Sequence, residues 1–240
     1  MRITRLLLCI VVALALTASS TVFAGVMVPG GLAPGDTYRL IFVTEGVIEG
    51  NHSFSDFNQF VTDQANQNLD LLTLGTTWSA IVSSHSITAL SNTLTSPNLS
   101  SQSPIYLIDG RKIADNYTDL WDGSIDHSID ITQFGDSISV SVWTGTRPDG
   151  RARAGLVIEP GAILGLRGLS NAASSSWVDD NNALTETLSN MYGISGILTV
   201  PQSQVPEPNS IIMVIGLASC GAIGGAIRRR HRFSIQQYEK

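Results

Sequence analysis

The chain has 240 residues, of which 43% are hydrophobic and 14% are charged, and its formal net charge is −6. Residues 1–24 and 201–240 carry 7 of the 14 basic residues but only 2 of the 20 acidic ones, so residues 25–200 have a net charge of −11. An acidic surface of this kind repels phosphate groups, which excludes nucleic acid as a partner. Both cysteines, Cys9 and Cys220, lie outside residues 25–200, so that segment forms no disulfide and no cysteine metal site.

Residues 1–24 have the pattern of a secretory signal peptide. Arg2 and Arg5 form a basic start, an apolar centre follows over residues 6–16, and small residues lead to Ala24. This arrangement predicts export through the secretory translocon and cleavage after Ala24. The apolar centre is too short to favour a membrane span.

Residues 25–200 have the size of one domain, and their hydrophobic spacing predicts an α+β fold with long loops. The segment 37–44 predicts a strand. Ser53 and Asp56 have the spacing of a capping box, and apolar residues then recur every three or four positions as far as Ala65, which predicts a helix. Further strands are expected at residues 78–82, 104–108, 139–144 and 194–200, and loops at residues 83–103 and over most of residues 145–182.

The stretch 109–136 is the strongest candidate for chemistry in this domain, because it is rich in side-chain oxygens. Calcium takes about six to eight oxygen ligands, which acidic loops supply. A calcium or ligand loop would use Asp109, Asp115, Asn116, Asp119 and Asp122, with Asp126, Asp130 and Asp136 following in the same stretch. The spacing does not fit an EF-hand. The alternative is that these side chains cap turns by accepting hydrogen bonds from nearby backbone amides.

The tryptophans are expected to fill the core, because the domain has few other aromatic side chains. If they were exposed, they would instead stack on sugar rings. The four are Trp78, Trp121, Trp143 and Trp177, and the core interpretation is weakest for Trp177, which lies among serines.

Catalytic patterns are missing from the sequence. No serine stands in a Gly-x-Ser-x-Gly elbow, and His52, His85 and His127 lie in polar segments without the spacing of zinc ligands. We therefore expect a protein that is not an enzyme, and calcium is the one cofactor that the sequence suggests.

Residues 201–240 have three parts that together predict a sorting tail. The hinge 201–210 contains the rigid triplet Pro206, Glu207 and Pro208. The apolar run 211–227 is just long enough to cross about 30 Å of hydrocarbon as a single transmembrane helix. The basic end 228–240 begins with Arg228, Arg229 and Arg230, which resist translocation and hold this end in the cytoplasm. The alternative, a buried C-terminal helix of a soluble domain, does not explain the basic cluster.

Together, the two ends resemble the PEP-CTERM proteins of Gram-negative bacteria. The resemblance implies processing near Pro206–Pro208 by an exosortase-like transpeptidase, with anchoring in the inner membrane beforehand. It also implies export to the cell surface or to the extracellular polysaccharide matrix. This chain departs from the pattern in that eight residues, 233–240, follow the basic cluster.

Several segments between residues 38 and 200 are similar to an uncharacterised bacterial surface domain that is related to endostatin. The strongest is Ile113–Ser124, and others are Leu40–Thr44, Leu74–Ala80, Pro104–Gly110, Val142–Thr146 and Ser174–Trp177. The resemblance implies a C-type lectin-like fold. This chain lacks the cysteines that related domains often carry in the first helix and after the Trp-Thr-Gly segment.

These observations favour an exported, non-catalytic surface or matrix protein that binds extracellular polysaccharide. One alternative is a structural or adhesive surface protein without a specific ligand, whose acidic surface keeps a matrix hydrated. Another is a polysaccharide hydrolase, which requires two carboxylates facing each other across a cleft.

Overall fold

The computed structural model describes residues 28–202. The predicted signal peptide, with its expected cleavage site at Ala24, lies outside the described residues. So do the predicted sorting triplet Pro206–Pro208, the apolar run 211–227 and the arginines Arg228–Arg230. Within residues 28–202, no helix is both long enough and apolar enough to cross a membrane.

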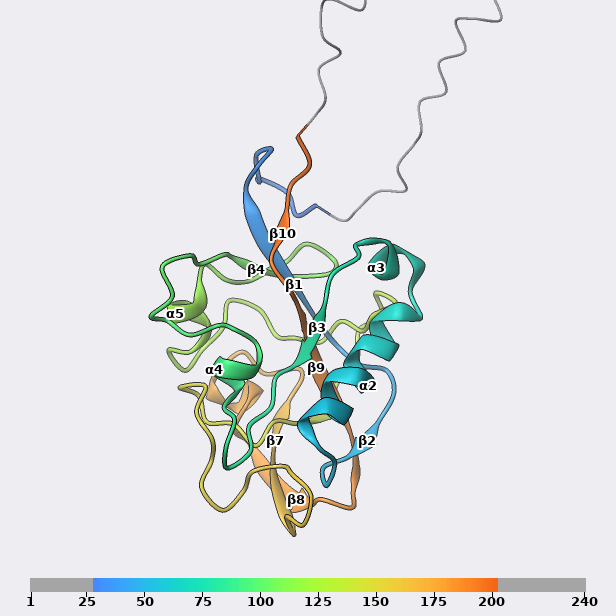
Figure 1. Ribbon diagram of the computed structural model, residues 1–240, viewed down its shortest axis with the longest axis vertical. Helices are drawn as coiled ribbons and strands as arrows, with labels where there is room; N and C mark the ends of the chain where they lie inside the picture. Colours follow the sequence, from blue (N-terminus) through green and yellow to red (C-terminus); the bar gives the residue numbers. More distant parts are fainter. Residues whose placement is uncertain (1–27, 203–240) are drawn as a thin grey trace, which may run out of the picture. The chain divides into compact units, whose positions relative to one another are not determined.

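Residues 28–202 form a mixed α and β structure whose core is mostly sheet, with few helices (Figure 1). The strands are β1 (Thr37–Val43), β2 (Ile48–Glu49), β3 (Trp78–Ala80), β4 (Ile105–Leu107), β5 (Lys112–Ala114), β6 (Ser141–Trp143), β7 (Leu164–Leu169), β8 (Asn181–Leu184), β9 (Leu188–Ser195) and β10 (Leu198–Thr199). The helices are α2 (Phe54–Asn66), α3 (Leu69–Thr73), α4 (Ala89–Asn92), α5 (Tyr117–Leu120) and the 3₁₀ turn η1 (Ser175–Trp177).

The strands form one sheet in the order β5-β4-β1-β9-β6-β7-β8, and β9 lies at its centre. β9 pairs antiparallel with β1, β2 and β3 and parallel with β6. From Tyr38 to Val43, every side chain of β1 is buried, because β1 is covered on both faces. Aromatic and β-branched residues suit such a strand, and the prediction of a strand at 37–44 is confirmed.

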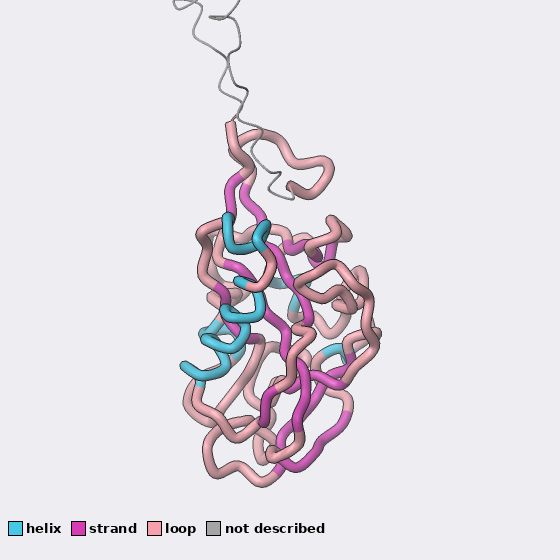
Figure 2. The backbone as a smooth tube through the Cα atoms, turned by 90° about the vertical axis from the view of Figure 1, so that its right-hand side faces the viewer, coloured by secondary structure: helices cyan, strands magenta, loops and turns pink. Residues whose placement is uncertain are grey.

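Helix α2 covers one face of the sheet. Ser53 caps its first turn, and Asp56 returns the hydrogen bond in the capping box predicted from the sequence. Phe57, Val61 and Ala65 are buried along one stripe of the helix, which packs against β3 and β9. Figure 2 shows α2 on one side of the strands and long loops on the other.

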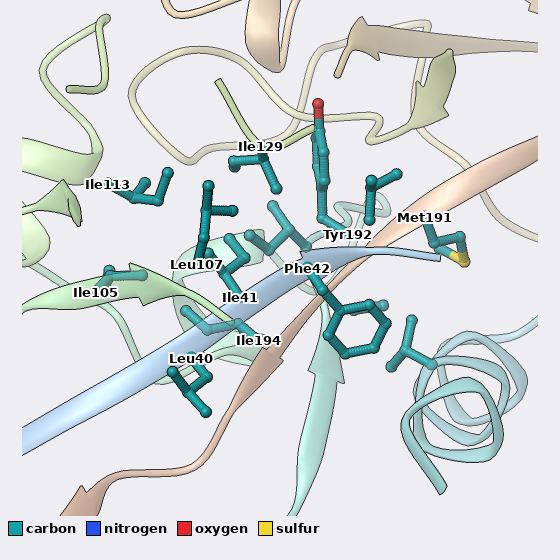
Figure 3. Packing of buried hydrophobic residues seen from close by; sticks show 14 of the residues in the cluster. Leu40, Ile41, Phe42, Ile105, Leu107, Ile113, Ile129, Met191, Tyr192 and Ile194 are labelled. Atoms are coloured by element: carbon teal, nitrogen blue, oxygen red, sulfur yellow. The ribbon is translucent and has the colours of Figure 1, made fainter. Parts of the chain in front are cut away.

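Apolar side chains of β1 and β9, together with others from the loops, fill the core on both faces of the sheet (Figure 3). All four tryptophans are buried, which confirms the core interpretation, including that of Trp177. The Trp177 ring lies 5.6 Å from the ring of Trp121 and 5.8 Å from that of Tyr192, measured between centroids. The hydroxyl of Tyr192 donates to the carbonyl of Trp177 at 3.0 Å.

In the second half of the chain, one expectation is confirmed and another is wrong. Residues 145–182 are mostly loop, as predicted, although they also contain β7 and the first residues of β8, which pair with each other. The predicted strand 194–200 is interrupted at Gly196. Up to Ser195, β9 pairs with β3. After the interruption, β10 pairs with the start of β1 instead.

The two ends of the domain lie together. Thr37 of β1 stands opposite Thr199 of β10, the amide of Gly35 donates to the carbonyl of Val200 at 3.0 Å, and the amide of Val200 donates to Asp36 at 2.8 Å. In Figure 1 this pair is at the top, and β7 and β8 are at the bottom. The chain therefore leaves the domain at the end opposite to the β7–β8 pair.

Gly168 on β7 offers a test of this packing. A side chain at this position would overlap the carbonyl oxygen of Trp177 and lie 2.8 Å from the Cα of Val178. We predict that Gly168→Ala lowers the free energy of unfolding by about 1–3 kcal/mol, as overpacking does in other cores. Chemical denaturation measures this change. Gly30→Ala is the control, because nothing lies within 4 Å of its added methyl group. Equal losses in the two variants would contradict the packing described here.

Candidate functional site

Two carboxylates of the acidic stretch 109–136, those of Asp109 and Asp130, form ion pairs with one arginine. The Nε of Arg111 donates to Asp109 and its Nη2 donates to Asp130, each at 2.8 Å. Asp109 also accepts a hydrogen bond from the amide of Arg111 at 3.0 Å. One arginine therefore neutralises two acidic residues that are distant in sequence.

The other residues of this stretch stabilise local structure. Asn116 caps α5 by accepting from the amides of Thr118 and Asp119 at 2.9 and 3.1 Å. Asp119 accepts from the amide of Asp115 at 2.6 Å. These are the turn and cap contacts of the alternative interpretation.

The last two candidate ligands follow the same pattern. Asp122 accepts from the amide of Ser124 at 3.1 Å. Asp115 pairs with Lys112 at 2.5 Å, and this hydrogen bond raises the pKa of the lysine ammonium. Within residues 28–202, no group of three or more histidine, cysteine, aspartate or glutamate side chains is arranged to hold a metal ion.

We predict that calcium does not stabilise this domain. A bound ion raises the melting temperature of the state that binds it, whereas carboxylates already held by Arg111, Lys112 and backbone amides gain little from calcium. Thermal unfolding of the full-length chain in excess calcium and in excess chelator should give the same melting temperature. A melting temperature that rises in calcium, with a rise that Asp119→Asn removes, would contradict this prediction and favour a calcium-binding loop.

The three histidines do not form a catalytic group with one another. The ring of His127 contacts the carbonyl of Lys112 at 2.8 Å, and the Nδ1 of His52 lies 3.9 Å from Asp56. His85 instead contacts Glu159 twice: its Nδ1 lies 2.5 Å from one carboxylate oxygen, and its amide donates to the other at 3.0 Å. The hydrogen bond from the backbone amide of His85, together with the one from its ring, lowers the pKa of Glu159 and so favours the ionised carboxylate.

Two adjoining hollows lie beside this His85–Glu159 pair. The first, of about 300 Å³, is lined by Asn51, Gly161, Ala162, Ile163, Leu184, Thr185 and Glu186. The second, of about 390 Å³, is lined by His85, Gly155, Val157, Gly161, Ala162, Ile163 and Leu164. Both share the segment 161–163, and we refer to them together as the paired hollow.

The paired hollow is held in place by β7 and β8. Leu164 stands opposite Leu184 in this strand pair. Thr185, just beyond β8, donates its hydroxyl to the carbonyl of Ala162 and its amide to the carbonyl of Ile163, the latter at 3.0 Å. On the other side, the carboxylate of Glu159 joins the same segment to His85, in the loop after β3. The walls therefore come from loops that the sheet brings together.

Aliphatic side chains are exposed around the paired hollow. Ile163 is 75% exposed and Leu184 is 55% exposed, and Leu164 is exposed as well. Apolar surface of this kind beside polar groups is typical of a binding site. This site is not predicted from the sequence, because none of its residues belongs to a motif. The apolar run at 162–164, within a segment expected to be loop, was the one available signal.

Comparison with known proteins adds no assignment to this geometry. No family model matches the chain, and no curated protein is similar enough to match it.

Proposed function

We propose that the chain is an exported, non-catalytic protein of the cell surface or extracellular matrix that binds polysaccharide through the paired hollow. The signal peptide and the sorting tail support export and processing by an exosortase-like transpeptidase. One observation carries the binding part of the proposal: the chain leaves the domain at the β1–β10 end, and the paired hollow lies beside β7 and β8 at the opposite end (Figure 1).

A C-type lectin-like, endostatin-related fold is part of the proposal. The sheet core with long loops on one face is compatible with it. So is the position of α2, which begins about ten residues after β1, as the resemblance requires. Trp121 and Trp143, which belong to the segments that carry the resemblance, are buried. Those segments therefore belong to the core, and the ligand-binding surface that we propose lies at the hollows instead.

The surroundings of Glu159 favour binding over hydrolysis. A glycosidase needs a protonated carboxylic acid as its general acid, with a raised pKa. Both oxygens of Glu159 accept hydrogen bonds from His85, and the pKa of Glu159 is lowered. The exposed aliphatic side chains around the paired hollow also favour binding over the alternative of a surface protein without a ligand, because such a protein gains nothing from exposed apolar surface.

The binding part is tested with polysaccharide extracted from the producing cells. We predict that the full-length chain in detergent sediments with this polysaccharide, and that the bound fraction is the same in calcium and in chelator. The independence from calcium follows from the carboxylates of Asp109, Asp119 and Asp130, which are held by Arg111 and by the amide of Asp115. Without sedimentation in either buffer, the proposal fails and the ligand-free structural role replaces it.

The sorting part is tested at the C-terminus of the mature protein. Mass spectrometry of the surface fraction should give a last residue near Pro206–Pro208, because the transpeptidase is expected to cut near this triplet. Glu207→Ala should leave the chain intact and in the membrane fraction. Pro201→Ala, in the same hinge but outside the triplet, is the matched control and should be processed normally. A mature protein that still ends at Lys240 would contradict processing.

A further inference from the structure

The two hollows share one wall, which makes them neighbouring parts of a single groove. Gly161, Ala162 and Ile163 line both. Ile163 lines both hollows and is 75% exposed, so its apolar side chain is accessible to a ligand in either space. A ligand long enough to occupy both hollows must pass over this side chain.

Two glycines line the second hollow. Gly155 and Gly161 have φ angles of 76° and 85°, which favour glycine, and a methyl group built on either meets no atom within 4 Å. The remaining side chains of this hollow are mainly aliphatic, from Val157, Ile163 and Leu164. This space therefore suits a small apolar substituent of a ligand.

Each hollow also has polar groups that are free to bind a ligand. In the second hollow, Glu159 occupies the Nδ1 of His85, whose side chain is 69% exposed, so the Nε2 is left for a ligand. In the first hollow, the side chains of Asn51 and Glu186 make no hydrogen bond to another described residue. Hydroxyl and amide groups of a ligand would satisfy these three side chains.

Charge limits the class of ligand. Glu159 and Glu186 lie at the groove, and residues 25–200 carry a net charge of −11, so a polyanion is repelled. A neutral sugar chain has hydroxyl groups for the polar side chains and a C–H face for Ile163. An acetamido group adds the methyl that the second hollow accommodates.

We propose that the paired hollow is a groove with two subsites for a linear, neutral, N-acetylated glycan that lies across Ile163. This inference rests on the proposed polysaccharide binding and specifies its ligand class and its contacts.

The test uses the full-length chain in detergent and calorimetric titration with N-acetylglucosamine oligomers. The tetrasaccharide should bind about tenfold more tightly than the disaccharide, because only the longer chain fills both subsites. Ile163→Asp should weaken tetrasaccharide binding by about tenfold or more, by placing a charge under the sugar face. Leu69→Asp is the matched control: Leu69 is 70% exposed, lies on α3 outside the lining of either hollow, and should change nothing.

Two further variants probe opposite ends of the groove. Glu186→Gln and His85→Ala should each weaken binding of the tetrasaccharide. One of the two variants should leave binding of the disaccharide unchanged, because the disaccharide fills only one subsite. His127→Ala is the control for His85→Ala, because His127 lies outside both hollows. An oligomer of the same length without acetyl groups should bind weakly at high salt, where its positive charges are screened.

The outcomes separate this inference from the function on which it rests. If the chain binds the cells' polysaccharide and Ile163→Asp does not weaken this binding, the paired hollow is not the binding site, but polysaccharide binding still stands. If Ile163→Asp abolishes binding of that polysaccharide but the acetylated oligomers never bind, the ligand class is wrong. If neither the polysaccharide nor any oligomer binds, both proposals fail.

Discussion

Large aromatic side chains packed directly against glycine backbone hold this domain together. Trp143 lies between two such positions: an added methyl group would come within 2.9 Å of its ring at Gly165 and within 3.0 Å at Gly50. The carbonyl of Trp177 leaves no space for a side chain at Gly168. Because residues 25–200 contain no cysteine, packing has to provide the stability that disulfides give to many exported domains. Truncating a buried tryptophan costs about 3–5 kcal/mol in other proteins. Among the described residues, the buried Nε1 of Trp177 has no hydrogen-bond partner, which costs about 1–3 kcal/mol of stability. The stability gained by packing the ring is larger than this cost.

The same packing positions the candidate site. The Nε1 of Trp143 donates to the carbonyls of Ile48 and Thr187, at 3.0 and 3.2 Å, and so joins β2 to the turn after β8. In that turn, the carbonyl of Thr185 accepts from the amide of Gly50 at 2.6 Å, and its hydroxyl and amide hold the segment 161–163. The paired hollow is thus built on hydrogen bonds that begin at a buried tryptophan. This arrangement favours a preformed surface, whose binding does not require its loops to become ordered.

The elements that the sequence predicted well are those whose signal is local. β1 and α2 follow from an apolar strand, a capping box and a helical spacing, all within short windows. β7 was missed, because Gly165 and Gly168 resemble loop residues until Trp143, Trp177 and Ile158 are placed beside them. The sequence does not decide whether the acidic stretch 109–136 binds calcium or caps turns. Its spacing does not show that Arg111 reaches both Asp109 and Asp130. The paired hollow depends on loops brought together only by the fold, which no motif records.

A buried cation secures the place where the chain leaves the domain toward its tail. Arg39 is only 3% exposed; its Nε donates to the carbonyl of Ser195 at 2.6 Å and its Nη1 to that of Thr93 at 2.7 Å. Burial lowers the pKa of this guanidinium, yet an arginine stays charged at any physiological pH, so the carbonyls and the nearby ring of Tyr117 must stabilise a full charge. Such burial is expensive unless the geometry is well satisfied. The contact joins the end of β9 to the end of α4, next to the turn into β10. A pull on the chain beyond Val200 therefore reaches the buried centre of the sheet after only a few residues.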